Sequence, residues 1–247
     1  MKKSASTLGG EEVEGRRAVL ELLRADRRRV HSVLLSGSVE RDDVVDEIVE
    51  RAGPRLRTVT PEKLANQARS DGHQGVLANA EPLRAADFDE LCEARDAFLV
   101  ALDGVTDPRN LGAIMRVAET AGATGIVLPR HRSARITAAV TKAAAGAIEY
   151  LPVAVVGGIP AALERAKRSG CWTAGLDERG ERTLYEFDLA DQPLVLVLGA
   201  EGRGLARLTR ERCDMVVSIP MHGHIASLNV ATAAALACHE IARRRAQ

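Results

Sequence analysis

Aromatic side chains are scarce in this sequence, since phenylalanine, tyrosine and tryptophan together make up 2% of its 247 residues. A nucleic-acid partner is therefore not held mainly by stacking of bases on aromatic rings. The apolar content of 46% is still ample for a packed core. We expect globular domains whose cores consist of alanine, valine, leucine and isoleucine.

Lysine is also scarce, with five residues among the 34 basic ones, so arginine supplies almost all of the positive charge. Guanidinium groups suit planar, bidentate contacts with phosphates. A G+C-rich genome would produce the same bias, and composition does not separate the two explanations. The 34 acidic residues bring the formal net charge to zero. Neutrality favours a protein with local basic patches over one that coats nucleic acid.

Long apolar runs and closely spaced cysteines are absent as well. No stretch approaches the ~20 apolar residues of a membrane span, and the first 15 residues lack a hydrophobic signal segment. We therefore predict a cytoplasmic protein. The cysteines are too far apart in sequence for metal-binding or redox motifs, so we predict reduced, structural thiols and no metal site: Cys92, Cys171, Cys213 and Cys238.

The chain alternates helical and strand-like segments in two regions. Residues 1–80 form a small α/β unit in this interpretation, and residues 81–96, with Pro82 and a cluster of acidic residues, form a linker in which a short helix is possible. The second region, 97–247, contains continuous apolar runs such as FLVALDGV and LVLVLG. Such runs are typical of parallel strands covered on both faces.

Three loops rich in glycine and asparagine lie in the second region, at Asp103–Arg116, Leu196–Leu205 and Ser218–Val230. Each resembles a strand that runs into a tight turn and then a helix. In α/β proteins this arrangement exposes backbone N–H groups and places polar side chains at one sheet edge. We expect the chemistry of the protein there.

The first loop predicts a helix with Asp107 as its N-cap and Pro108 at its first position. Asn110 then lies in the first turn. Arg116 lies among apolar residues of the same helix, and burying a guanidinium without an anionic partner is costly. A pair between Arg116 and Glu119 is the simplest alternative, because residues three apart are neighbours on a helix.

The second loop contains Gly199, Gly202 and Gly204, with Glu201 between the first two. Their order matches neither the dinucleotide fingerprint nor the phosphate-binding P-loop. A nucleotide-dependent oxidoreductase is therefore disfavoured. Three glycines in six residues still allow a ligand to approach the backbone closely.

In the third loop, Ser227 is the expected cap of a long helix rich in small residues, and Asn229 is its conspicuous polar residue. A purely structural explanation makes Asn229 a hydrogen-bonded core amide. His222 and His224 flank Gly223, but two histidines without a third ligand are weak evidence for a metal.

Taken together, the order and spacing of these three loops resemble the SpoU branch of the SPOUT RNA methyltransferases, over residues 98–245. Glu14, Gly15 and the run His73–Val76 resemble the substrate-binding domain of bacterial 23S rRNA guanosine 2′-O-methyltransferases. The resemblance implies a knotted, parallel-sheet α/β methyltransferase domain preceded by a small α/β domain similar to RNA-binding ribosomal proteins. It also implies homodimers with the active site near the subunit interface.

The resemblance further implies S-adenosylmethionine as methyl donor, no metal, and transfer to a ribose 2′-hydroxyl. The expected substrate is a guanosine in the P-loop of 23S rRNA. Carried over by position, the cofactor-binding residues are Leu198, Gly199, Gly202, Gly204, Ile219, Met221 and Leu228. The catalytic set is Asn110, Arg116, Glu201, Ser227 and Asn229.

Contact with RNA is expected from three arginine clusters, namely Arg27, Arg28 and Arg29, then Arg130, Arg132 and Arg135, and finally the region of Arg203. Neutralisation of phosphates would make binding salt-dependent. Each cluster fits a solvated surface equally well. Two other functions stay open: a tRNA ribose methyltransferase, and a catalytically silent RNA-binding protein of ribosome assembly.

Overall fold

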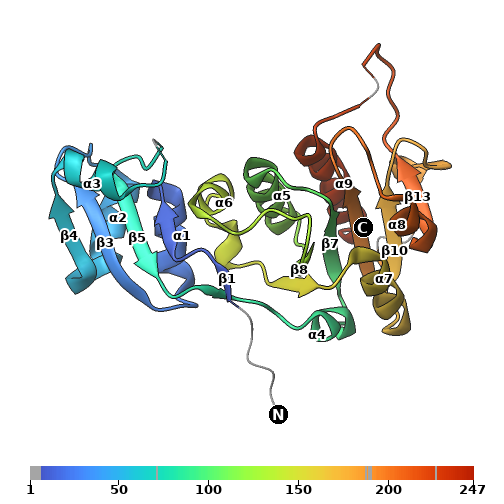
Figure 1. Cartoon of the computed structure of the whole chain (residues 1–247), viewed down its shortest axis with the longest axis horizontal. Helices are drawn as coiled ribbons and strands as arrows, with labels where there is room; N and C mark the ends of the chain where they lie inside the picture. Colours follow the sequence, from blue (N-terminus) through green and yellow to red (C-terminus); the bar gives the residue numbers. More distant parts are fainter. Residues whose placement is uncertain (1–6, 71, 187, 189–190, 226) are drawn as a thin grey trace.

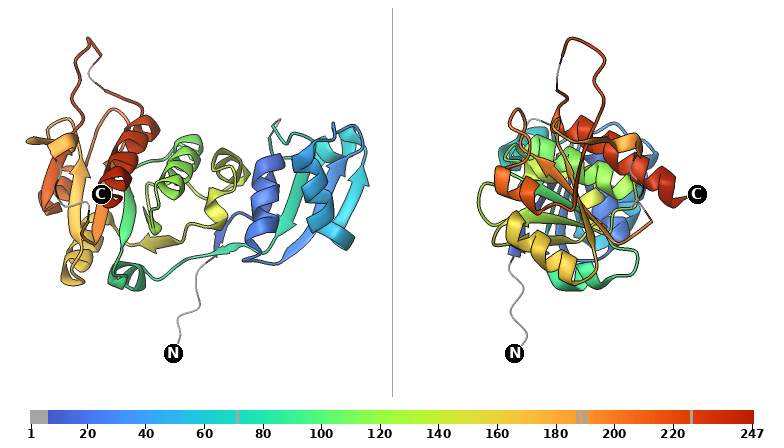
Figure 2. Two further views of the ribbon diagram at one scale, coloured as in Figure 1. Left: turned by 180° about the vertical axis from the view of Figure 1, so that it is seen from behind. Right: turned by 90° about the vertical axis from the view of Figure 1, so that its right-hand side faces the viewer.

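The computed structural model describes residues 7–70, 72–186, 188, 191–225 and 227–247. They form an elongated molecule with a four-stranded sheet toward one end and a seven-stranded sheet toward the other, and a two-stranded sheet in addition (Figures 1 and 2). The N-terminal sheet has four strands in the order β2-β5-β3-β4. Its strands are β2 (Glu12–Glu14), β3 (Val30–Ser36), β4 (Leu56–Val59) and β5 (Val76–Ala80). Its helices are α1 (Arg16–Ala25), α2 (Asp43–Ala52), α3 (Pro61–Gln67) and the 3₁₀ turn η1 (Gly53–Arg55).

The apolar faces of α1 and α2 build the core of this first unit together with the sheet. Leu20, Ile48 and Val33 are almost fully buried there. The Asp42 side chain caps α2 by accepting from Val45 N, and Thr60 caps α3, which has Pro61 at its first position. The alternation of helices and strands predicted for the first region is therefore confirmed over its described residues.

The larger sheet is entirely parallel, with seven strands in the order β11-β13-β10-β12-β7-β8-β9. Its strands are β7 (Phe98–Asp103), β8 (Gly125–Pro129), β9 (Val153–Val156), β10 (Trp172–Leu176), β11 (Arg182–Thr183), β12 (Leu194–Gly199) and β13 (Met215–Ser218). The helices are α5 (Pro108–Thr120), α6 (Ala138–Ala143), η2 (Ala147–Glu149), α7 (Ile159–Arg168), η3 (Leu184–Glu186), α8 (Arg207–Arg212) and α9 (Val230–Arg245).

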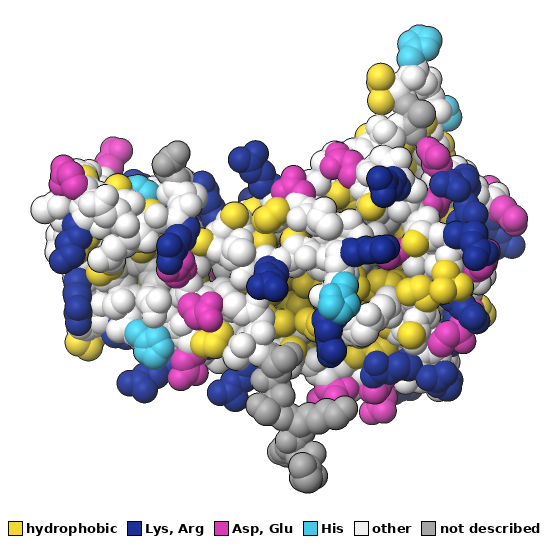
Figure 3. Space-filling view, in the orientation of Figure 1, with side chains coloured by type: hydrophobic (Ala, Val, Ile, Leu, Met, Phe, Trp, Pro, Cys, Tyr) yellow, Lys and Arg dark blue, Asp and Glu magenta, His cyan; other side chains and the backbone are white. Residues whose placement is uncertain are grey.

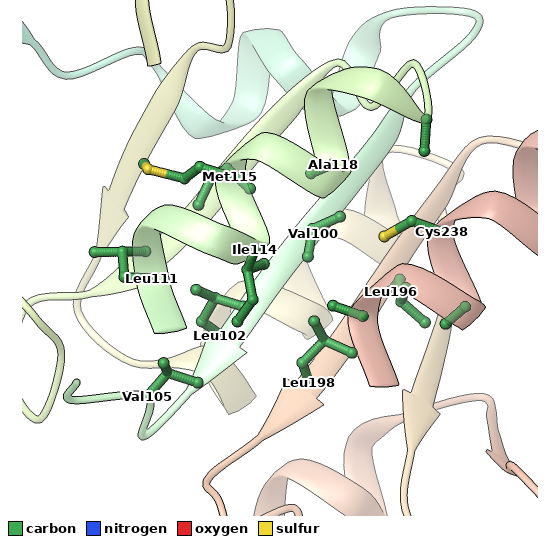
Figure 4. Close-up of a cluster of buried hydrophobic side chains, with 14 of the residues drawn as sticks. Val100, Leu102, Val105, Leu111, Ile114, Met115, Ala118, Leu196, Leu198 and Cys238 are labelled. Carbon is green, nitrogen blue, oxygen red and sulfur yellow. The ribbon is translucent and has the colours of Figure 1, made fainter. Parts of the chain in front are cut away.

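Two apolar cores cover the two faces of this sheet, as the continuous apolar strands predicted. On one face, Leu111, Ile114 and Met115 of α5 pack with β7, β12 and Cys238 of α9 (Figure 4). On the other face, Ile159 and Leu163 of α7 cover β7 and β12. Two short strands of this sheet were not predicted: β9, which lies between Pro152 and Gly157, and the two-residue β11.

The segment 81–96 has more structure than a plain linker. It contains β6 (Leu83–Arg84), which pairs with β1 (Thr7–Gly9), and α4 (Phe88–Glu93), whose first turn is capped by Asp87. Phe88 and Cys92 of α4 are buried in the core of the larger sheet. Most of this segment therefore packs as part of the second unit.

Arg28 joins the two units through a buried ion pair. Its guanidinium binds both carboxylate oxygens of Glu149, at 2.9 and 2.6 Å, and the two side chains are only 6% and 1% exposed. The remaining terminal nitrogen donates to the carbonyls of Gly10 and Glu81, each at 2.7 Å. These carbonyls belong to the two segments through which the chain crosses between the units. Every guanidinium nitrogen of Arg28 is already bound inside the protein, so we leave this residue out of the RNA contacts proposed below.

Contacts around this ion pair tie the units together further. The Tyr150 hydroxyl donates to Glu21 of α1 at 2.7 Å, and Arg27 donates to the Tyr150 carbonyl at 2.9 Å. Burial, with the hydrogen bond to Glu21, raises the pKa of Tyr150 to about 12. Gly146 permits the close approach, since a Cβ there would lie 2.3 Å from Cβ of Glu21.

Arg28→Met tests the contribution of this ion pair to stability. Removing one partner leaves the Glu149 carboxylate buried and unpaired, so the free energy of unfolding in urea should fall by about 3–5 kcal/mol. Arg29→Met is the matched control, because Arg29 is exposed, and its effect should stay within about 0.5 kcal/mol. Equal effects of the two substitutions would mean that the buried pair does not hold the units together.

Candidate active site

The three loops singled out in the sequence meet at the carboxyl edge of the larger sheet. The second and third loops, together with residues 176–179, line an open cavity of about 820 Å³ there. The segment 219–225, which follows β13, stands out from the body of the molecule (Figures 1 and 3). Of the predicted residues, the cavity walls contain Gly199, Glu201, Gly202, Gly204, Ile219, Met221, Ser227 and Leu228. Leu198 lies one position earlier, with its side chain in the core (Figure 4).

The turn 199–204 of the second loop, called the glycine loop below, closes on itself directly after β12. Ala200 N donates to the carbonyl of Gly204 at 3.0 Å, and Gly204 N donates back to the carbonyl of Ala200 at 2.9 Å. Gly202 and Gly204 have φ values of +72° and +65°, which favour glycine. Gly199 is required for another reason, because a Cβ there would lie 2.2 Å from the carbonyl carbon of Gly204.

Two carboxylates hold this loop in place by accepting hydrogen bonds from backbone N–H groups at its end. The side chain of Asp177, at the end of β10, is fully buried and accepts from Leu205 N at 2.9 Å and from Arg179 N at 3.1 Å. Asp103, at the end of β7, accepts from Ala206 N at 3.1 Å. Asp177 was not among the residues predicted for the site. Its one signal was its position, as a charged residue that directly follows a buried strand.

Three of the predicted catalytic side chains lie together, one from each loop. Asn110 Nδ2 donates to Glu201 Oε2 at 3.2 Å. Asn229 Nδ2 lies 3.0 Å from Asn110 Oδ1 and 3.3 Å from Glu201 Oε1. Glu201 and Asn229 are exposed and Asn110 is partly exposed, so the Glu201 carboxylate is held by two amides and still faces solvent.

The cap of the last helix differs from the prediction. Helix α9 begins at Val230, and Asn229 Oδ1 caps it by accepting from Ala231 N at 2.8 Å. Ser227 lies before the helix on the cavity wall, so its prediction as cap is wrong. Asparagine and serine are equally good caps, and here asparagine also binds the side chains of the other two loops.

Arg116 does not join this polar cluster. It lies on α5, whose N-cap is Asp107 as predicted, but its side chain is exposed. Ile114 and Met115 face the core instead. Across the part of the chain that the structure describes, Arg116 forms no ion pair, so the expected pair with Glu119 is absent.

The arginines expected to contact RNA are mostly accessible. Arg29, Arg130, Arg132, Arg135 and Arg203 are exposed, whereas Arg28 is not available. Basic and acidic side chains alternate over the face shown in Figure 3, with no single large basic patch. Within the described ranges, no helix is long and apolar enough to cross a membrane, and no group of three metal-ligating side chains occurs.

Residues 97–239 match the model of the SpoU rRNA methylase family. The chain belongs to this family. Residues 13–86 match a second model, described as RNA 2′-O ribose methyltransferase substrate binding. The resemblance drawn from the three loops is therefore confirmed, and so is the predicted SPOUT fold class.

Relatives match over nearly the whole chain. The chain is 40% identical over 237 residues to the 23S rRNA (guanosine-2′-O-)-methyltransferase RlmB of Ralstonia nicotianae, covering 94% of each protein. It is 37% identical to YacO of Bacillus subtilis, a putative TrmH family tRNA/rRNA methyltransferase, covering 94% of this chain and 95% of YacO. The SpoU methyltransferase AviRb from Streptomyces viridochromogenes, crystallised with AdoMet, superposes with a TM-score of 0.79 at 28% identity, covering 95% of this chain and 90% of that structure.

Gly199→Ala tests the constraint on the glycine loop. The added methyl group meets backbone atoms that cannot rotate away, so we expect a loss of about 3 kcal/mol in unfolding free energy and faster hydrogen exchange at Leu205 N. Gly202→Ala is the matched control, because nothing lies within 4 Å of its Cβ position. The positive φ alone should cost it about 1 kcal/mol. Equal losses would contradict the close-approach argument.

Proposed function

We propose that this protein transfers a methyl group from S-adenosylmethionine to the 2′-hydroxyl of a guanosine ribose in 23S rRNA. The observation that carries this proposal is the hydrogen-bonded cluster of Asn110, Glu201 and Asn229, which lies beside a cavity whose wall includes the glycine loop. Membership of the SpoU family and 40% identity to RlmB of Ralstonia nicotianae support the reaction and the substrate.

The cavity walls fit the proposed cofactor. The glycine loop presents backbone without side chains at three positions of the wall, and Ile219, Met221 and Leu228 supply apolar surface for an adenine ring. When bound, S-adenosylmethionine supplies a methyl group activated by a positively charged sulfur. No metal is needed for such a displacement, because alignment of the hydroxyl and removal of its proton are the main tasks.

The roles of the polar residues follow from their contacts. Asn110 and Asn229 orient the Glu201 carboxylate, and Glu201 accepts the proton of the ribose hydroxyl. Ser227, on the cavity wall, contributes a further hydroxyl for positioning. Arg116 orients the target ribose or phosphate and stabilises the developing negative charge on oxygen. A guanidinium is poorly suited to be the base, because it stays protonated in proteins.

We further propose that the active protein is a homodimer that pairs through α5 and α9. These helices pack on each other and leave Arg116 and Leu236, which is 40% exposed, on the outside of the same layer. In such a dimer, Arg116 of one subunit serves the cavity of the other. This arrangement explains why the guanidinium of Arg116 forms no ion pair with the described residues of its own chain.

Three further parts of the proposal concern architecture and location. Strand β12 lies between β10 and β7, β13 lies beyond β10, and the chain then returns to α9, an order that supports a trefoil knot. The two larger sheets support an RNA-binding domain at 1–80, a connection at 81–96 and a methyltransferase domain at 97–247.

An rRNA substrate supports a cytoplasmic location. The proposed contacts with RNA phosphates are Arg27, Arg29, Arg130, Arg132, Arg135 and Arg203.

Methyl transfer to RNA tests the proposal directly. We expect purified protein with radiolabelled S-adenosylmethionine to label 23S rRNA from a strain that lacks the gene, and reverse-transcription stops should locate a single 2′-O-methylguanosine in the P-loop. Bulk tRNA from the same strain is the second substrate. Labelled tRNA with unlabelled rRNA would favour a tRNA ribose methyltransferase. No label in either would favour the silent assembly protein.

Mixing of two inactive variants tests the shared active site. Arg116→Ala and Glu201→Gln should each abolish most methyl transfer. After subunit exchange, half of the dimers are mixed and each mixed dimer has one intact site, so about a quarter of the normal activity should return. Absence of any recovery, with subunit exchange verified by native mass spectrometry, would mean that Arg116 acts within its own subunit or that no dimer forms.

A further inference from the structure

A second cavity, of about 470 Å³, lies at the end of the N-terminal sheet, where the turn 73–75 meets the start of α1. We propose that it holds one unpaired base of the RNA substrate, away from the nucleotide that is methylated. This inference rests on the proposed function and adds the contact by which the first domain recognises RNA. The cavity is lined by Arg16, Ser38, Val39, Glu40, Pro61 and His73, among others.

The turn is held rigidly from two sides. Gln74 has a φ of +52°, which is uncommon for a residue with a side chain. Its side-chain oxygen accepts from Arg16 N at 3.1 Å, and its carbonyl accepts from Arg16 Nε at 3.3 Å. Gly75 has a φ of +77°, and a Cβ there would lie 2.8 Å from Val39. Such a conformation persists only where its surroundings impose it.

Both hydrogen-bond donors and hydrogen-bond acceptors line the cavity. Gly75 N donates to His73 Nδ1 at 3.0 Å, so the neutral ring carries its proton on Nε2 and has a donor left for a ligand. Ser38 Oγ lies 3.0 Å from Ser36 Oγ and has further hydrogen-bonding capacity. The Glu40 carboxylate is exposed and has no hydrogen bond or ion pair to another described residue. A carboxylate accepts from the ring and exocyclic N–H groups of a base.

The rest of the wall suits a base better than a free phosphate. Val39 and Pro61 provide aliphatic surface for the face of a ring. Arg16 is the cation, but one of its terminal nitrogens already binds Asp42 at 2.7 Å. Glu40 and Asp42 at this site would repel an anion. An unpaired base matches the whole set, because sequence-specific RNA recognition uses splayed-out bases bound through their edges.

The position of this cavity separates it from the methyl-transfer site. The two cavities lie toward opposite ends of the long axis, on the four-stranded sheet and on the carboxyl edge of the seven-stranded sheet (Figures 1 and 2). The Arg28–Glu149 ion pair holds the two units together. Lys142 of α6 also reaches the segment before the turn, since a Cβ on Gly72 would overlap its Nζ at 1.5 Å. The bound base therefore anchors the RNA at a fixed separation from the methylated ribose.

RNA affinity, measured without cofactor, tests this inference. The probe is a transcript of the 23S rRNA P-loop region in a filter-binding assay. Glu40→Ala and His73→Ala should each weaken binding roughly tenfold, the equivalent of about 1.4 kcal/mol. His31→Ala is the matched control, since His31 is exposed on β3 outside the cavity, and it should bind normally. Cofactor affinity should be unchanged in all three.

Glu40→Ala is the decisive variant, because it removes a negative charge from an exposed position. If the cavity had no specific role, general electrostatics would make this variant bind RNA slightly more tightly. Weaker binding therefore requires a specific contact. A photo-crosslinker in place of Gln74 should also attach to a nucleotide other than the methylated one.

The other outcomes separate the two proposals. Normal RNA affinity of both cavity variants would overturn the inference and leave the methyltransferase proposal intact. Normal RNA affinity with weaker binding to a ribosomal precursor particle would also overturn it, because the cavity would then hold a protein segment. RNA binding that depends on the cavity, without methyl transfer by the unaltered protein, would contradict only the proposed function.

Discussion

The position of β12 between β7 and β10 is the constraint on which the candidate active site depends. Its register with β7 places Gly199 opposite Asp103, although nearly a hundred residues separate them in the chain. Because both strands are parallel and buried, their carboxyl ends reach the same edge and their loops start side by side. The same edge receives the end of β13, and with it the segment that leads to Asn229. Without this strand order, Asn110, Glu201 and Asn229 would not meet.

Buried charge serves two different purposes in this molecule. The carboxylate of Asp177 has no contact with solvent. Its oxygens accept hydrogen bonds from the backbone N–H groups of Leu205, which follows the glycine loop, and of Arg179, two residues further along its own turn. It keeps the cavity wall in one shape before any ligand binds, which reduces the entropy that binding must offset. Arg28 is a buried cation whose partners come from the other unit and from both crossing segments. It fixes distances between domains and has no direct part in binding at the cavity.

The sequence was most informative where local chemistry decides the structure. The apolar runs identified the main parallel strands, and the Asp107–Pro108 pair identified the start of α5. Three consecutive arginines, in contrast, look alike in sequence, and only the approach of η2 places Glu149 opposite Arg28. The choice between Ser227 and Asn229 as cap depended in the same way on side chains from distant loops. Exposure of Arg116 was missed because an arginine between apolar neighbours can lie on the outer side of a helix.

The side-chain amide of Asn229 uses its oxygen and its nitrogen for different contacts, and this restricts which residues can replace it. Its oxygen receives N–H groups from the first turn of α9, so its nitrogen is left to meet the oxygens of Asn110 and Glu201. An aspartate has the same shape and would cap the helix equally well. It would, however, bring a second carboxylate against that of Glu201 and push the two loops apart. Helix formation and assembly of the reaction centre thus share one side chain, and only an uncharged amide satisfies both.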